Sequence, residues 1–155
     1  MSETDPAPPQ NCGTIVVVGG GCYGSYYVRQ LERAARAGAI VAHELVVIDH
    51  DPECAVARTL QRGAETAIRT SVVVAEWRDY FDAYLADASN EPLSAESDAI
   101  VPSPLMPHLM GAWLVDRARD RWPDRNIATK PFDRAPTVPW DRSGDDGTHY
   151  VSFAT

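Results

Sequence analysis

The stretch TIVVVGGGCYGSYYVRQL, residues 14–31, decides the fold that this chain is expected to adopt. It begins with a run of β-branched residues, which is typical of a strand buried on both faces of a sheet. The residues after the run have apolar side chains at helical spacing. Between these two segments stand four glycines: Gly19, Gly20, Gly21 and Gly24. A strand, a glycine-rich turn and a helix are therefore predicted in immediate succession.

The rest of the chain continues this alternation of strand and helix. Strands are predicted at Thr14–Val18, Leu45–Ile48, Ser71–Ala75, Asp98–Val101, Asn126–Thr129 and Tyr150–Phe153. Helices are predicted at Ser25–Gly38, Asp51–Leu60, Arg78–Ala88 and Leu109–Arg121. This order predicts an α/β fold with a mostly parallel sheet, helices on both faces and right-handed crossovers.

Two segments between the predicted elements have specific expectations. Asp51 is expected to be the N-cap of its helix, with Pro52 at the first helical position. The segment Ala35–Glu44 is expected to be an extended connection from a helix to the next strand.

Composition limits the class of protein. The chain has 155 residues, 45% of them hydrophobic, and a formal net charge of −8, so nucleic acid is not an expected partner. The N-terminus has no signal-peptide pattern and no apolar run is long enough to span a membrane, so no membrane association is expected. Three cysteines without metal-ligand spacing predict neither a disulfide framework nor a metal site, and favour a cytoplasmic location.

The predicted elements divide the chain into three parts. Residues 1–13 are expected to be a disordered N-terminal lead-in, and residues 14–130 a nucleotide-binding domain. Residues 131–155 are a Pro-, Asp- and Gly-rich extension, expected to be a surface connector that ends in a strand. The sequence leaves open whether the chain stops before its natural C-terminus.

The glycines have the spacing G-x-G-x-x-G between a predicted strand and a predicted helix, which is the context of a dinucleotide-binding turn. Gly19 permits the tight turn, Gly21 lets a pyrophosphate approach the backbone, and Gly24 lets the helix pack closely on the strand. Gly20 is the glycine that this motif does not require. Cys22 and Tyr23, which lie inside the glycine loop, complete the expected set of cofactor-binding residues.

An acidic residue at the end of the second strand is the other half of this motif. Asp49 occupies that place, 25 residues after Gly24, where a carboxylate accepts hydrogen bonds from ribose hydroxyls and repels the extra phosphate of NADP. No arginine follows, because the next residues are His50, Asp51 and Pro52. The pattern favours NAD over NADP. A glycine turn that binds no nucleotide, and a methyltransferase sheet, are the alternatives.

These motifs resemble the Rossmann-type NAD(P)-binding superfamily, through IVVVGGGCYGSYYVRQL, ELVVIDHDPE and SDAIV. Within it, the order is similar to the TrkA-N (RCK) type of nucleotide-sensing domain, over roughly Thr14–Thr129. The resemblance implies a Rossmann-like domain that binds NAD(H) through Gly19, Gly21, Gly24 and Asp49, frequently as a dimer. Ala75-Glu76-Trp77-Arg78 differs from that type, which usually has a Gly-Asp pair after the third strand.

Candidates for catalysis are few. His108 follows the fourth strand and Lys130 follows the predicted fifth strand, so both are weak candidates for acid–base groups at the carboxyl ends of the sheet. Cys22 is expected to be a small buried filler rather than a redox-sensitive thiol. His50 and Cys54 are not expected to bind a metal.

Three hypotheses follow from these features. The first is an NAD(H)-binding domain that acts as a binding, sensing or regulatory module, as a homodimer or with a partner protein. The second is a small NAD-dependent oxidoreductase whose active site is completed by a partner subunit or dimer mate. The third is an interaction protein that has kept the fold and lost the ligand.

Overall fold

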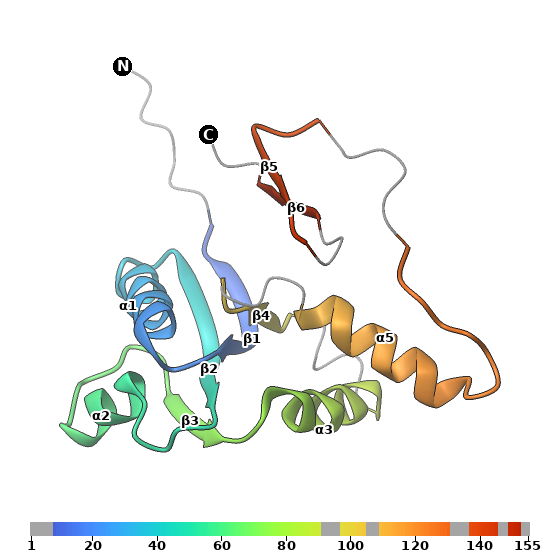
Figure 1. Ribbon diagram of the computed structural model, residues 1–155. Coiled ribbons are helices and arrows are strands. Elements are labelled where there is room, and N and C mark those ends of the chain that lie inside the picture. Colours follow the sequence, from blue (N-terminus) through green and yellow to red (C-terminus); the bar gives the residue numbers. More distant parts are fainter. Residues whose placement is uncertain (1–7, 91–96, 105–108, 131–136, 146–148, 153–155) are drawn as a thin grey trace. The chain divides into compact units, whose positions relative to one another are not determined.

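The computed structural model describes residues 8–90, 97–104, 109–130, 137–145 and 149–152. The chain divides into two compact units, residues 1–109 and 110–155. The first unit holds a parallel sheet with its helices (Figure 1), and the second holds most of one helix and a β-hairpin. This boundary lies inside the range 14–130 that we expected to form one domain.

Four parallel strands form the sheet of the first unit. They are β1 (Gln10–Val18), β2 (Ile40–Asp49), β3 (Thr70–Val74) and β4 (Ala99–Val101). Their order is β3-β2-β1-β4, so the chain moves outward from β1 to β3 and then returns to the other side of β1. In an open α/β sheet, ligands bind at the carboxyl ends of the strands beside such a reversal. The crevice expected here lies between β1 and β4.

The two central strands are buried on both faces. Every residue of Ile15–Val18 and Leu45–Ile48 is at most 7% exposed. Helices α1 (Cys22–Arg36) and α2 (Ala55–Gln61) cover one face of the sheet, where Val17 and Val47 belong to the main core cluster. Helix α3 (Trp77–Asn90) lies on the other side of the sheet (Figure 1) and contributes the fully buried Phe81. The predicted α/β fold is confirmed.

The first two strands are longer than their apolar runs. Residues Gln10–Thr14 pair with Ile40–Glu44, before β3 or β4 has joined the sheet at Leu45 and Ile15. This two-stranded ribbon is held by backbone hydrogen bonds and is partly exposed, so hydrophobicity does not reveal it. The expected connection Ala35–Glu44 therefore contains the end of α1 and the start of β2. In the same way, Gln10–Gly13 belong to β1 and not to the N-terminal lead-in.

Asp51 and Pro52 form a turn and do not begin a helix. The Asp51 side chain accepts a hydrogen bond from the Glu53 N–H at 2.8 Å, and its carbonyl accepts one from the Cys54 N–H at 3.1 Å. Helix α2 begins at Ala55, with Cys54 as an N-cap that makes no side-chain hydrogen bond. The predicted N-cap role of Asp51 was wrong because Asp and Pro also suit the first two positions of a β-turn.

The second unit differs more from expectation. Helix α5 (Leu109–Arg121) has the predicted bounds, but the predicted strand Asn126–Thr129 has no strand structure. Instead, the Arg119 side chain donates a hydrogen bond to the Ile127 carbonyl at 3.3 Å. Strands β5 (Trp140–Ser143) and β6 (His149–Ser152) form an antiparallel hairpin. Strand β6 confirms the predicted terminal strand within the described residues, whereas β5 lies in the expected connector.

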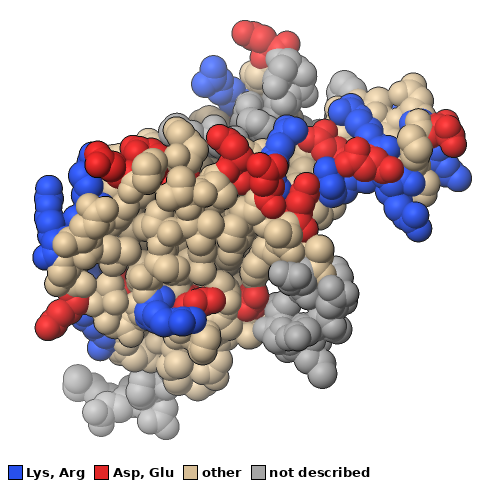
Figure 2. All heavy atoms as spheres, turned by 90° about the horizontal axis from the view of Figure 1, so that it is seen from below, with Lys and Arg blue, Asp and Glu red and all other residues tan. Residues whose placement is uncertain are grey.

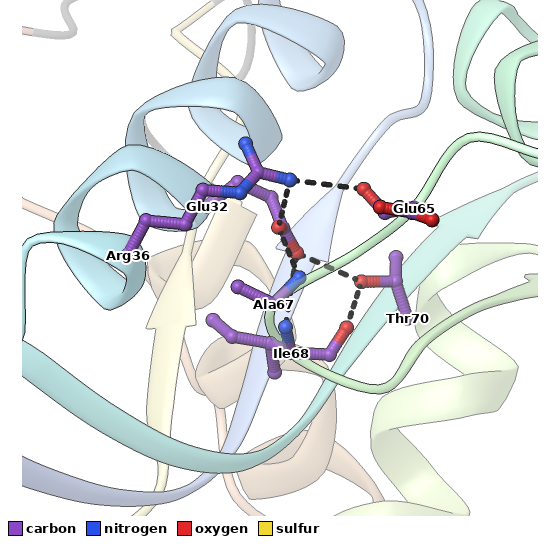
Figure 3. Close-up of polar contacts among 6 residues, drawn as sticks. All are labelled: Glu32, Arg36, Glu65, Ala67, Ile68 and Thr70. Carbon is purple, nitrogen blue, oxygen red and sulfur yellow. Dashed lines mark hydrogen bonds and ion pairs between the residues drawn. The ribbon is translucent and has the colours of Figure 1, made fainter.

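One carboxylate is buried in the first unit. Glu32 of α1 is 6% exposed and accepts hydrogen bonds from the N–H groups of Ala67 at 2.6 Å and Ile68 at 3.2 Å. Arg36, one turn later, forms an ion pair with it at 3.3 Å (Figure 3). Glu32 therefore ties α1 to the segment that leads into β3.

We expect Glu32→Ala to lower the free energy of unfolding by about 2–3 kcal/mol, because it leaves backbone N–H groups without an acceptor. Urea denaturation followed by circular dichroism measures this change. Glu65→Ala is the matched control, since only the backbone carbonyl of Glu65 receives the hydrogen bond from Arg36. An equal loss of stability in the two variants would contradict the role given to Glu32.

Candidate functional site

The glycine turn joins β1 to α1 at the carboxyl edge of the sheet. Gly19 has a φ of +87°, a backbone conformation that residues with a Cβ rarely adopt. Its N–H donates a hydrogen bond to the Ile48 carbonyl at 2.7 Å, so the turn begins while still attached to β2. The predicted role of Gly19 in the tight turn is consistent with this geometry.

Gly24 brings the first turn of α1 against this loop. A Cβ at Gly24 would lie 1.7 Å from the Gly19 carbonyl oxygen, and 3.8 Å from a methyl group of Val17. No side chain fits there, because the nearest atom is backbone and cannot move aside. The helix thus approaches the end of the strand as closely as the motif requires.

Gly20 is also required, although the sequence motif leaves it without a role. It is buried, and a Cβ there would lie 2.4 Å from the Sγ atom of Cys54. Its carbonyl accepts a hydrogen bond from the N–H of Val56 at 3.1 Å, which attaches the first turn of α2 to the loop. Three consecutive glycines exceed what the motif needs, and that excess was the signal available in the sequence.

Gly21 differs from Gly20 and Gly24 because it is exposed and a Cβ would meet no atom within 4 Å. It is the N-cap of α1 and has no side chain to cap the helix. Among the described residues, none accepts a hydrogen bond from the N–H groups of Cys22, Tyr23 or Gly24. The loop therefore presents unpaired donors and the positive end of a helix dipole beside open space.

Side chains at the start of α1 are turned toward solvent. Tyr23 is 50% exposed and Tyr26 is 51% exposed. Cys22 is also exposed, so the expectation of a small buried filler was wrong. Cys22 is the first residue of α1 and lies between Gly21 and Tyr23, which are also exposed.

Asp49 stands at the end of β2, where the motif predicts an acidic residue, and its side chain is 12% exposed. Its Oδ2 accepts a hydrogen bond from the Gly20 N–H at 2.6 Å, and its Oδ1 accepts one from the Asp51 N–H at 2.9 Å. The carboxylate thus holds the glycine loop and the loop after β2 together. Each carboxylate oxygen can accept a second hydrogen bond.

The two weak candidates for catalysis are not placed relative to this edge. His108 lies outside the described residues. Lys130 is exposed and belongs to the second unit, whose position relative to the sheet is not determined. Pro102 and Ser103 follow β4, and Ala75 follows β3 with its N–H bonded to the Asp49 carbonyl at 3.1 Å. The titratable pair that the described residues place at this edge is Asp49 and His50, whose Oδ1 and Nδ1 atoms lie 3.5 Å apart.

Two tyrosines of α3 have shifted pKa values, but they lie near the opposite edge of the sheet. Tyr84 donates a hydrogen bond to Asp98, which precedes β4 and also accepts one from the Thr14 N–H at 2.6 Å. Burial, assisted by this bond, raises the pKa of Tyr84, and burial raises that of its stacked neighbour Tyr80. This cluster joins α3 to the amino ends of β1 and β4, so its role is structural.

No family model, curated protein or solved structure matches the chain. Within the described residues, no helix is both long and apolar enough to cross a bilayer. The same residues contain no group of three His, Cys, Asp or Glu side chains that could hold a metal ion.

We expect Gly24→Ala to lower the free energy of unfolding by more than about 3 kcal/mol, because the new methyl group meets the Gly19 carbonyl. Chemical denaturation measures the loss. Gly111→Ala makes the same change in α5, where a Cβ meets no atom within 4 Å, and we expect it to stabilise the protein by about 0.5–1 kcal/mol. A mild effect of Gly24→Ala would show that the helix does not approach the loop so closely.

We expect Asp49→Ala to lower the free energy of unfolding by about 2–3 kcal/mol without any ligand, because the N–H groups of Gly20 and Asp51 lose their acceptor. Asp51→Ala is the control, since its exposed side chain bonds only the Glu53 N–H. Thermal and urea denaturation of both variants measure the difference. Unchanged stability of Asp49→Ala would mean that the carboxylate does not hold the loop.

Proposed function

We propose that the chain binds the dinucleotide NAD(H) at the carboxyl ends of β1 and β2, as a binding or sensing module. The observation that supports this most directly is the start of α1. Its unpaired N–H groups face open space at Gly21, next to the point where the strand order reverses. A pyrophosphate fits this position because it accepts several hydrogen bonds and carries the charge that the helix dipole favours.

Asp49 supports a dinucleotide with a free ribose over one with a 2′-phosphate. Its oxygens already accept hydrogen bonds from Gly20 and Asp51, and each can accept one more from a ribose hydroxyl. A phosphate would instead meet the Asp49 carboxylate and the neighbouring Asp51 and Glu53, with no arginine beside them in the sequence. This balance of charge favours NAD(H) over NADP(H).

The proposal is binding or sensing and not catalysis. Hydride transfer usually requires a group that donates or accepts a proton at the substrate. Among the described residues, Asp49 and the exposed His50, with Oδ1 and Nδ1 atoms 3.5 Å apart, are the groups beside the glycine loop on which the oxidoreductase alternative would depend. Oxidation of NADH by an added substrate would instead support an NAD-dependent oxidoreductase.

Gly21→Ala tests the proposal without a steric clash, because a Cβ at Gly21 meets no protein atom. Its φ of −75° and ψ of −146° lie outside the regions that alanine prefers, so the free energy of unfolding of the variant is measured beside its affinity. We expect NADH to raise the melting temperature of the unmodified protein, by an amount that corresponds to about 2.7 kcal/mol at a ligand concentration of 100 times Kd. In Gly21→Ala we expect the Kd to rise at least about tenfold, because the methyl group occupies the space of the pyrophosphate.

Gly111→Ala serves as the control for this experiment too, since it makes the same substitution in the second unit. We expect it to leave the Kd for NADH unchanged. Titrations with NADPH, AMP and S-adenosylmethionine, followed by tryptophan fluorescence, test the choice of nucleotide. Absence of any nucleotide-dependent stabilisation, or tighter binding of S-adenosylmethionine than of NADH, would overturn the proposal.

A further inference from the structure

Helices α1 and α2 enclose a groove of about 290 Å³ on the outer side of the sheet. Its apolar lining includes Val28 of α1 and Val56 and Leu60 of α2. Its charged lining consists of Arg29, Arg33 and Arg36 together with Glu32 of α1 and Glu65 of the segment after α2. The volume lies near the lower end of the range of ligand pockets, which is about 300–1,000 Å³. The groove thus has a mostly apolar wall, with arginine side chains of α1 along it.

The two helices are basic, although the chain as a whole has a net charge of −8. In the view from below, basic side chains lie along the left margin, the side on which Figure 1 shows α1 and α2 (Figure 2). Together the helices carry four arginines, Arg29, Arg33, Arg36 and Arg58, and one acidic residue, Glu32. Such a local excess of positive charge attracts anions.

Glu32 does not neutralise the arginines of the groove. Its carboxylate is buried and accepts hydrogen bonds from two backbone N–H groups (Figure 3). The one arginine that contacts it, Arg36, forms an ion pair with it and also donates a hydrogen bond to the Glu65 carbonyl at 2.9 Å. Arg29 and Arg33 form no ion pair with any residue that the structure describes.

The placement of Arg29 does not stabilise α1. Arg29 and Arg33 are four residues apart, and like charges at this spacing destabilise a helix by about 0.2–0.5 kcal/mol. The helix dipole favours basic residues in the last turn, which accounts for Arg33 and Arg36 but not for Arg29, about two turns before the end. An anionic ligand removes the repulsion between the two guanidinium groups.

We propose that this groove binds a small organic carboxylate with an apolar body, such as a medium-chain fatty acid. Arg29 and Arg33 hold the carboxylate through charge-assisted hydrogen bonds, for which the planar guanidinium is well suited. The apolar body lies against Val28, Val56 and Leu60, which removes apolar surface from water. This site is separate from the glycine loop and does not depend on nucleotide binding there.

The test uses octanoate as the probe, with octanol and octylammonium as ligands of the same chain length without the negative charge. Isothermal calorimetry and the melting temperature report binding. We expect saturable binding of octanoate to the full chain, at least about tenfold weaker binding of octanol, and no binding of octylammonium. Gly21→Ala should leave octanoate binding unchanged, which separates this proposal from the one on NAD(H).

A matched pair of double variants tests whether Arg29 and Arg33 hold the carboxylate. Arg29→Gln with Arg33→Gln should weaken octanoate binding at least about tenfold. Arg58→Gln with Arg62→Gln removes the same charge from exposed positions that do not line the groove, and should leave the Kd unchanged. The proposal is overturned by equal losses in the two double variants, by no saturable binding of octanoate, or by equal affinity for octanol.

Discussion

The hydrogen bond from the Gly20 N–H to the Asp49 carboxylate is the contact on which the candidate site depends. It joins the loop after β1 to the end of β2 at 2.6 Å, and the other carboxylate oxygen fixes the loop that follows β2. Because two backbone segments share one side chain, neither can shift without losing a hydrogen bond. This connection keeps the N–H groups at the start of α1 directed toward open space.

Asp49 and Glu32 have the same structural role, which is to accept hydrogen bonds from backbone N–H groups. Each is a largely buried carboxylate whose two oxygens accept hydrogen bonds from backbone N–H groups, and each connects its own element to a segment about 30 residues away in the sequence. A carboxylate is a suitable tie because it accepts several strong hydrogen bonds at once. The α1–α2 side of the sheet is thus fixed by two acidic residues, whereas Arg29 and Arg33 remain without an ion pair among the described residues.

The central features of the fold could be predicted from the sequence because they depend on burial. The runs Ile15–Val18 and Leu45–Ile48 are apolar without interruption and occupy the centre of the sheet. The strand ribbon at Ile40–Glu44 could not be predicted in this way, since its stability comes from backbone pairing with β1. The N-cap role predicted for Asp51 was wrong for a different reason. The residue types that begin a helix also form turns, and only the hydrogen-bond partners distinguish the two.

Part of the candidate site could be located from the sequence and part could not. Gly19, Gly24 and Asp49 are located by spacing alone, and the geometry at each fits the motif. The requirement for Gly20 could not be recognised locally, because the atom that excludes a side chain belongs to Cys54 on another element. His108 falls outside the described residues and Lys130 in the second unit, so the sequence-based expectation of catalytic groups stays a prediction.

The contact between Gly20 and Cys54 has a consequence for how this sequence can change during evolution. A Cβ at position 20 would lie 2.4 Å from the sulfur and 3.1 Å from the Cβ of Cys54. With alanine at position 54 the 3.1 Å contact to its Cβ and the 3.3 Å contact to a methyl group of Val47 remain, so a larger residue at position 20 requires both neighbours to shift. The size of the side chain allowed at position 20 is therefore set by residues of another strand and of the loop before α2, and not by the glycine loop itself.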